Sequence, residues 1–169
     1  HYDEDHIAGL VGVLNTTAVD TAITPDYSMD TKIYRSFREM LAACGAAEIH
    51  PQVGQAFTLD GAQVQVLSPA SFDHENKNDN SIVVRISYGE FSCLITGDAE
   101  TDIEEELLTS GYTLNSDVYV VGHHGSSSSS SPDFVRAVSP EYALISVGAG
   151  NKYGHPTQQT LDTLTDNHV

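Results

Sequence analysis

Two predicted hairpins lie inside a chain that otherwise alternates strands and helices, and they limit the fold more than any other feature. Residues 55–69 form two alternating segments around an Asp-Gly turn at 60–61, and residues 81–98 form two more around a Gly-Glu turn at 89–90. Asp-Gly between alternating apolar residues is a strong hairpin signal. Because hairpin strands run antiparallel, the pattern predicts an α/β fold with a mixed sheet rather than a doubly wound parallel one.

The rest of the chain alternates between the two types of element. The pattern predicts helices at 7–16, 31–45, 99–109 and 132–139, a last helix beginning near Pro156, and strands at 19–25, 117–124 and 142–148. The Ser126–Ser131 run before Pro132 is typical of a helix start, because serine oxygens cap helices and proline fits a first turn. With no internal repeat or linker, the 169 residues are expected to form a single domain, 1–169.

The charge balance limits the possible partners. Seven Lys and Arg residues against 24 Asp and Glu residues give a formal net charge of −17. Such a surface repels phosphate backbones, and the sequence shows neither a basic patch nor a series of stacking aromatic residues. A phosphate substrate would therefore have to be held by bound cations. No apolar run approaches the roughly 20 residues of a membrane-spanning helix.

Several reactive side chains are assigned ordinary roles. Cys44 and Cys93 are expected to be buried free thiols rather than a disulfide, which leaves the redox compartment open. His50, His74 and His168 are expected at the surface.

The first six residues crowd together potential metal ligands. His1, Asp3 and Asp5 alternate, so in an extended loop they point to one side, and His6 follows at the start of a helix. Imidazole and carboxylate groups both suit divalent ions such as Zn²⁺. The alternative is a solvated acidic loop that caps the helix.

Further candidate ligands follow predicted strands. Asp98 ends the apolar segment FSCLITGD, and His123 and His124 follow another. Adjacent residues of a strand point in opposite directions, so we expect at most one of the two histidines to be a ligand and the other to contact substrate. His155 lies in a turn flanked by Gly154 and proline. Taken singly, Asp98 as a helix cap and the histidines as surface residues remain alternatives.

These motifs occur in an informative order. HxDxDHxxG near the start, then NDNS, TGD, GHHGSxxS and GHP, resemble the metallo-β-lactamase fold family, and more narrowly the hydrolase-like domain of ComEC/Rec2-type competence proteins. The resemblance runs from His1 to about Leu164. It implies an αββα sandwich with mixed sheets. It also implies strands upstream of His1, so the domain is expected to be N-terminally incomplete and to lack these strands.

The resemblance also assigns roles to residues. His1 and Asp3 match positions that hold a first metal ion, Asp5 and His6 match positions that hold a second, and Asp98 matches the bridging carboxylate. The implied cofactors are two divalent metal ions, Zn or Mn.

The later motifs supply the other assignments. His124 matches a metal ligand of related phosphodiesterases, His123 a substrate-contacting position, and His155 a late ligand in several branches. The choice between His124 and His155 as the second-site ligand stays open. Substrate or ligand-supporting hydrogen bonds are expected from Asn80, Ser81 and Ser126.

Two departures from the family pattern affect the metal site. Asp3 stands where the first motif usually has its middle histidine, and the ligating histidine expected near Asn80 is missing. A site richer in oxygen ligands favours Mn²⁺ or partial occupancy over a tight Zn²⁺ pair. The same ligand set argues against antibiotic hydrolysis.

The resemblance implies a metal-dependent hydrolase of phosphodiester bonds, specifically a DNA nuclease of competence DNA uptake on the extracellular side of a bacterial membrane. In this mechanism Asp5 and Asp98 hold the attacking water, and His123 or His155 stabilises the transition state or protonates the leaving oxygen. One alternative is a phosphodiesterase for a cell-wall or small-molecule ester. Another is a catalytically degenerate domain that binds DNA or a partner. The oligomeric state is left open.

Overall fold

The computed structural model describes residues 1–169, which divide into two compact units, His1–Pro51 and Gln52–Val169. The prediction of a single domain over 1–169 stays a prediction beside this division. No helix combines the length and apolar character that crossing a membrane requires.

The first unit packs two helices beside a two-stranded parallel sheet. Its elements in chain order are α1 (Glu4–Thr16), β1 (Thr21–Ile23), α2 (Lys32–Cys44) and β2 (Ala47–Ile49). Helix α2 begins and ends as the sequence predicts, because Thr31 accepts a hydrogen bond from the backbone N–H of Tyr34 and Gly45 adopts a left-handed conformation with φ of 73°. The apolar faces of the helices meet in a core of Tyr2, Ile7, Leu14, Phe37 and Leu41.

The start of α1 and the presence of β2 differ from the predictions for this unit. Helix α1 begins at Glu4, three residues before the predicted start at residue 7, and Glu4 and Asp5 fill its first turn. Acidic side chains there interact favourably with the positive end of the helix dipole, a signal stronger than the apolar periodicity used for the prediction. Strand β2 was not predicted, since three residues are too few for an alternation pattern.

The second unit contains a six-stranded mixed sheet. Its elements are β3 (Ala56–Leu59), β4 (Ala62–Ser68), β5 (Val83–Tyr88), β6 (Phe91–Ile95), α3 (Thr101–Thr109), β7 (Val118–Val120), α4 (Pro132–Val138), β8 (Tyr142–Leu144) and α5 (Gln158–Asp166). The spatial order is β3-β4-β5-β6-β7-β8, antiparallel from β3 to β6 and parallel from β6 to β8. Both predicted hairpins and the mixed sheet are therefore confirmed.

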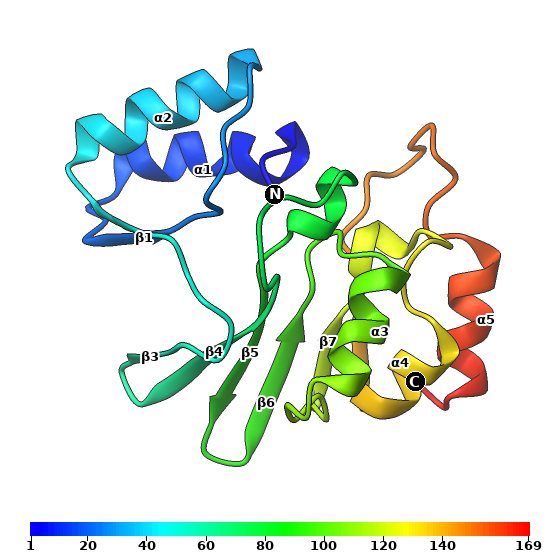
Figure 1. Cartoon of the computed structure of the whole chain (residues 1–169). Helices are drawn as coiled ribbons and strands as arrows, with labels where there is room; N and C mark the ends of the chain where they lie inside the picture. Colours follow the sequence, from blue (N-terminus) through cyan, green and yellow to red (C-terminus); the bar gives the residue numbers. More distant parts are fainter. The chain divides into compact units, whose positions relative to one another are not determined.

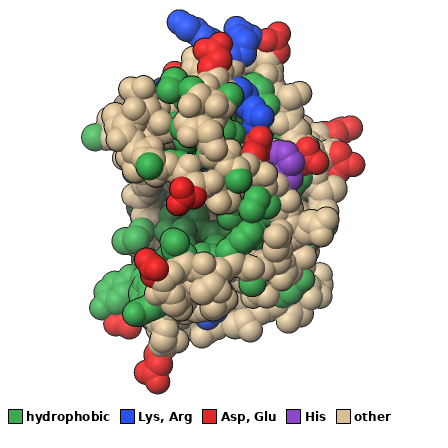
Figure 2. Space-filling model, turned by 90° about the vertical axis from the view of Figure 1, so that its left-hand side faces the viewer, with side chains coloured by type: hydrophobic (Ala, Val, Ile, Leu, Met, Phe, Trp, Pro, Cys, Tyr) green, Lys and Arg blue, Asp and Glu red, His purple; other side chains and the backbone are tan.

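The two faces of this sheet differ. Figure 1 shows α3, α4 and α5 on one side, and their side chains share a core with Leu94 and Tyr119, which are fully buried. The other face carries paired apolar rows, one of which runs Val66–Val84–Ile95–Val120–Leu144. Hydrophobic side chains gather on this side of the molecule (Figure 2). An apolar outer face is typical of a sheet that packs against a second layer.

Three predicted strands are shorter than expected. The strand predicted at 19–25 is β1 and occupies only Thr21–Ile23. The strand predicted at 117–124 ends at Val120, and a turn of 3₁₀ type occupies Gly122–Gly125. The strand predicted at 142–148 ends at Leu144. Local alternation does not reveal the end of β7, because apolar residues continue to Val121 while the backbone turns left-handed at His123 and His124.

The serine run also behaves differently from the prediction. Pro132 lies at the first position of α4, as predicted, but the Ser131 side chain makes no capping hydrogen bond. The neighbouring serines instead hold the loop before the helix. The Ser129 hydroxyl donates to the carbonyl of Gly122 at 2.9 Å, and Ser130 bonds the phenol of Tyr119 at 2.9 Å. Burial raises the pKa of Tyr119 to about 12, so this phenol stays protonated.

The two cysteines are free thiols, as predicted. Both are half-buried rather than fully buried. Burial raises the pKa of Cys93, which lowers its reactivity as a nucleophile.

Candidate metal centre

The parallel part of the second unit's sheet brings several polar loops to one edge. Strands β6, β7 and β8 run in the same direction, so their carboxyl ends lie side by side. The loop after β6 carries Asp98, the loop after β7 carries His123 and His124, and the loop after β8 carries Ser146 and His155. Ligands of open α/β sheets bind outside the carboxyl ends of strands.

Asp98 is held from its backbone side. It is buried, and its N–H donates to the Ser81 hydroxyl at 3.0 Å. Helix α3 has Glu100 rather than Asp98 at its N-cap position, so the Asp98 carboxylate is not the helix cap that the sequence left as an alternative. A Cβ atom on Gly97 would lie 3.0 Å from Ser81, so glycine lets the two loops approach closely. Both carboxylate oxygens of Asp98 face histidines.

His124 presents one ring nitrogen to Asp98. Its Nδ1 lies 2.8 Å from the carbonyl oxygen of Ser146, and its Nε2 lies 3.5 Å from Oδ1 of Asp98. A carbonyl oxygen only accepts, so Nδ1 carries the proton and Nε2 holds the lone pair in the neutral ring. An imidazole nitrogen and a carboxylate oxygen are both donor types that bind divalent ions such as Zn²⁺.

His123 is oriented in the same way. Its Nδ1 lies 3.1 Å from Oε1 of Glu100 and 3.2 Å from the hydroxyl of Ser128, while its Nε2 lies 3.8 Å from Oδ2 of Asp98. The Ser128 hydroxyl donates its own proton to Glu100 at 3.0 Å, so its oxygen accepts the Nδ1 proton and the Nε2 lone pair is directed toward Asp98. Glu100 thus orients His123 through Ser128, and partners that hold Nδ1 in this way fix the tautomer of metal-ligating histidines.

The expectation that His123 and His124 point in opposite directions is wrong. It assumed an extended strand, whereas both residues adopt left-handed backbone conformations, with φ of 48° and 55°. The turn directs both Nε2 atoms toward Asp98. The backbone N–H of His123 also donates to the carbonyl of Gly97 at 2.9 Å, which ties the two loops together.

His155 completes the group of histidines on this edge. Its ring centre lies 5.6 Å from that of His123, and the loop carrying it is tied to the histidine turn because Thr157 N–H donates to Gly125 O at 2.8 Å. The pKa of His155 is lowered from its ordinary value, first by burial and then by the neighbouring imidazoles of His123 and His124. A neutral imidazole is the form that can bind a metal ion or take up a proton.

Glu100 and Ser128 are two residues of this site that the sequence reasoning missed. Glu100 accepts hydrogen bonds from the side-chain amides of Asn76 and Asn78, both at 2.9 Å, and from the Ser128 hydroxyl at 3.0 Å. Its own backbone N–H donates to Asp79 at 2.9 Å. The available signal was its position two residues after Asp98 in the segment TGDAE.

The three predicted supporting residues take different places. Ser81 contacts the backbone of Asp98 directly. The Asn80 amide bonds the backbone of His74 and of Asn76, so it holds its own loop. Ser126 lies 3.0 Å from the Ser128 hydroxyl and reaches His123 through it. Of the predicted surface histidines, His50 is exposed and His74 is half-buried.

The first unit arranges its own ligand candidates around a buried tyrosine. The Tyr2 phenol donates to the carbonyl of Pro25 at 2.7 Å and its N–H donates to the Tyr27 hydroxyl at 3.1 Å, which anchors the loop. The rings of His1 and His6 lie 4.1 Å apart, and Nε2 of His6 lies 4.0 Å from Oδ1 of Asp5.

Asp3 stands at the N-cap of α1, and its side chain makes no capping hydrogen bond. The helix is capped instead through the Asp3 carbonyl, which accepts from the N–H groups of His6 and Ile7. The Asp3 carboxylate therefore does not cap the helix, in contrast to the alternative that the sequence left open.

Comparison with known proteins gives the family. The family model described as the metallo-β-lactamase superfamily matches residues 1–149, which is most of the chain. The chain belongs to the metallo-β-lactamase superfamily. The matched range includes every candidate ligand except His155.

Curated relatives place this metallo-β-lactamase chain near competence proteins. It is 33% identical over 168 residues to ComE operon protein 3 of Bacillus subtilis, covering 97% of the chain and 21% of the relative. It is 36% identical over 161 residues to competence protein ComA of Neisseria gonorrhoeae, and the match covers 94% of this chain and 20% of the relative. The chain therefore spans about a fifth of the length of these relatives.

A solved structure supports the fold. The metallo-β-lactamase fold protein YhfI of Bacillus subtilis superposes with a TM-score of 0.51 at 13% identity, covering 98% of this chain and 68% of that one. Together with the mixed sheet, this confirms the α/β, metallo-β-lactamase-like architecture. The superfamily indicates a metal-dependent hydrolase that binds divalent ions.

The second unit supplies donor atoms of the kinds that divalent ions bind. His124 Nε2 and Asp98 Oδ1 lie 3.5 Å apart, His123 Nε2 lies 3.8 Å from the other Asp98 oxygen, and both rings are held at Nδ1 by acceptors. Nitrogen and oxygen donors of this kind bind Zn²⁺ and Mn²⁺.

Proposed function

We propose that the chain is a metal-dependent phosphodiesterase that cleaves nucleic acid. The observation that carries this proposal is the anchored pair of imidazoles, which are held at Nδ1 by the Ser146 carbonyl and the Ser128 hydroxyl and present Nε2 to one buried carboxylate. Divalent ions held there would supply an activated water and neutralise charge on a phosphodiester.

The side chains of the protein would orient the metal-bound groups and transfer the proton. Asp98, fixed through its N–H by Ser81, contributes two oxygens in a defined orientation. To His155, whose ring lies beside His123, the proposal assigns the donation of a proton to the leaving oxygen. Its lowered pKa makes this imidazole a weaker base and a correspondingly better proton donor once charged. His124 or His155 remains the choice for the second-site ligand.

The N-terminal loop enters this proposal through the family resemblance alone. That resemblance assigns His1 and Asp3 to one metal ion and Asp5 and His6 to another. Two ions of Zn or Mn are proposed on that basis. Measurement of the metal content of a His6→Ala variant tests the assignment, which expects a loss of bound metal relative to the unmodified chain.

Nucleic acid as the substrate is supported by the names of the relatives. Two of them are named as a ComE operon protein and a competence protein, and competence concerns the uptake of DNA. A place on the outer side of a bacterial membrane is proposed on the same resemblance. The net charge of −17 fits an enzyme whose attraction for phosphate comes from bound cations rather than from its own surface.

The test is hydrolysis of a fluorescent oligonucleotide and of bis(p-nitrophenyl) phosphate, with added Mn²⁺ or Zn²⁺. We expect Asp98→Ala to reduce both activities by at least about 10³-fold, as loss of a central electrostatic group does, and to lower metal content in parallel. Asp102→Ala is the matched control, because Asp102 is an exposed acid in the first turn of α3.

The outcomes separate the alternatives. Full activity in Asp98→Ala would remove this carboxylate from the mechanism. Hydrolysis of the small diester without the oligonucleotide would favour a small-molecule or cell-wall ester. Bound metal without any hydrolysis would contradict the phosphodiesterase proposal, and absence of both metal and turnover would indicate a degenerate binding domain.

A further inference from the structure

The loop between β8 and α5 presents an aromatic ring beside the candidate metal centre. The Tyr153 side chain is 69% exposed, and its ring stacks on that of His155 with 5.8 Å between centres and 27° between planes. His155 in turn lies 5.6 Å from His123. A row of three rings therefore leads from the Asp98 carboxylate outward to solvent.

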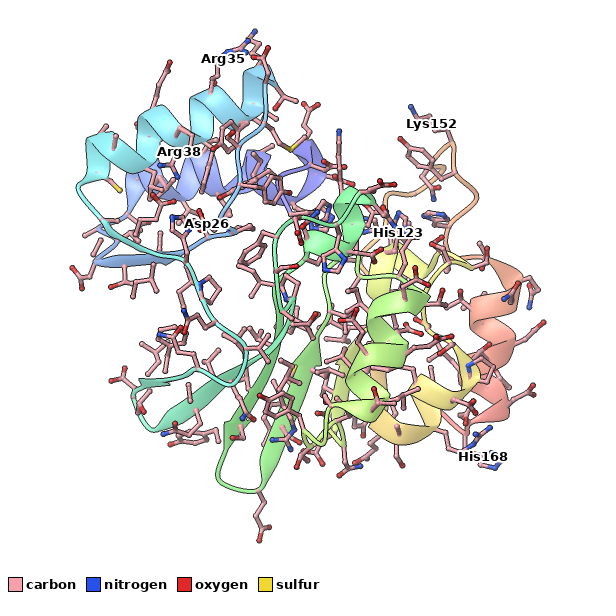
Figure 3. All side chains as sticks on the ribbon, viewed as in Figure 1. Asp26, Arg35, Arg38, His123, Lys152 and His168 are labelled. Carbon is pink, nitrogen blue, oxygen red and sulfur yellow. The ribbon has the colours of Figure 1, made fainter.

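A cation accompanies the exposed ring. The Lys152 ammonium lies 5.0 Å from the centre of the Tyr153 ring. Figure 3 shows Lys152 at the outer end of its loop, on the same end of the second unit as His123. By contrast, Arg136 of the same unit pairs with Asp133, and Arg85 donates to the carbonyl of Asn115.

Hydrogen bonds fix the shape of this loop. The Asn151 side chain accepts from the N–H groups of Tyr153 and His155, both at 3.1 Å, and donates to the carbonyl of His155 at 2.6 Å. The base of the loop is tied to the histidine turn through Thr157 N–H and Gly125 O. The tyrosine is thus held at a set position relative to the histidines.

An exposed tyrosine and a lysine in this position can bind the two parts of a nucleotide, its base and its phosphate. Every nucleobase offers a flat face that stacks on an aromatic ring, and a lysine contacts phosphate as a point charge. The net charge of −17 makes the protein surface as a whole repel a nucleic-acid strand, so a contact with the base adds affinity that the surface charge does not supply.

We propose that Tyr153 and Lys152 form a nucleotide platform, in which Tyr153 stacks on an unpaired base next to the scissile phosphate and Lys152 contacts a neighbouring phosphate. The proposal rests on the proposed function and deepens it, since it makes the base part of substrate recognition. A base that is stacked and paired inside a duplex does not reach the ring, so the platform selects single strands or frayed ends.

The experiment compares two oligomers with the same phosphates. One is a thymidine oligomer and the other is built from abasic tetrahydrofuran units. Binding is measured by fluorescence anisotropy in Mn²⁺ buffer on phosphorothioate versions, which resist hydrolysis, and KM and kcat are measured on the ordinary phosphodiesters.

We expect Tyr153→Ala to weaken binding of the thymidine oligomer by about 5- to 100-fold and to leave the abasic oligomer unchanged. Tyr153→Phe keeps the ring and should restore tight binding. Lys152→Ala should weaken both oligomers equally and reduce the salt dependence of binding. Tyr142→Ala is the control, because Tyr142 is 60% exposed on β8 and should have no effect.

Equal losses on both oligomers in Tyr153→Ala, or no loss on either, would overturn the platform. So would an identical effect of Tyr142→Ala. Base-dependent binding through Tyr153 without any hydrolysis would support the platform while refuting the phosphodiesterase proposal. Hydrolysis of both oligomers with equal KM would support the proposed function and refute the platform.

Discussion

Replacing Glu100 tests whether the carboxylate behind His123 orients it. In the structure Glu100 accepts from the Ser128 hydroxyl, which holds His123 Nδ1, and from the amides of Asn76 and Asn78, and one of its oxygens lies 3.1 Å from Nδ1. Glu100→Ala removes the acceptor that orients the Ser128 hydroxyl and the negative charge beside Nδ1, so the imidazole of His123 is free to rotate and to change tautomer. We therefore expect weaker metal binding and slower hydrolysis.

The size of the effect follows from these contacts. A hydrogen bond to a charged group contributes about 1.5–3 kcal/mol when buried. The Glu100 side chain is 24% exposed, so in Glu100→Ala water can replace part of the hydrogen bonding that the carboxylate provided. Loss of an outer partner of a metal-ligating histidine typically lowers metal affinity or activity by about 10- to 100-fold, which corresponds to about 1.4–2.8 kcal/mol.

The assay is titration of the chain with Mn²⁺ by calorimetry, together with hydrolysis of the small diester. Glu105→Ala serves as the control, because Glu105 is exposed on the same helix. Glu100→Gln retains an oxygen that can accept from the Ser128 hydroxyl and should recover part of the loss. An unchanged metal affinity in Glu100→Ala, with the fold intact by circular dichroism, would refute the role assigned to this carboxylate.

Two further predictions concern the loop that carries the histidines. Burial raises the pKa of Glu104 above its ordinary 4.5, although its carboxylate accepts from the N–H groups of Ser130 and Ser131. Above pH 4.5 the unfolded chain releases this proton before the folded one, so the free energy of unfolding falls as pH rises toward the raised pKa. In urea titrations between pH 4.5 and pH 7.5, the free energy of unfolding should fall less with pH in Glu104→Gln than in the unmodified chain. The same pH dependence in both proteins would contradict a raised pKa of Glu104. Gly125→Ala should destabilise the chain by more than about 1–2 kcal/mol, the cost of left-handed backbone alone. Its φ is 81° and the added Cβ would lie 2.6 Å from Pro156, so a melting temperature equal to that of the unmodified chain would be the contrary result.

Much of the fold could be predicted because its signals are local. The Asp-Gly turn at 60–61 and the turn at 89–90 each fix a hairpin through a few adjacent residues, and α2 carries both a threonine cap and a glycine stop. The ends of β7 and β8 could not be predicted in this way. Strand β7 ends where the chain enters a turn with left-handed backbone at His123 and His124, which an alternating apolar pattern does not encode.

The site was predictable as a set of chemical groups and not as an arrangement. Asp98, His123, His124 and His155 follow apolar segments or a tight turn, and the parallel order of β6, β7 and β8 brings them to one edge. The direction of the two adjacent histidines depends on a backbone turn that a strand pattern does not contain. Glu100 escaped notice because its partners come from segments more than twenty residues away.

The acidic composition and a polyanionic substrate are compatible only if positive charge is local. At the carboxyl edge of β6, the carboxylates of Asp79, Asp98 and Glu100 lie in one connected network with His123. Without cations that edge repels phosphate, and with divalent ions at the histidine nitrogens its sign reverses where the reaction takes place. Affinity for nucleic acid should therefore follow the divalent-ion concentration, with Lys152 adding one phosphate contact and the stacking ring supplying what the ions do not, namely recognition of the base.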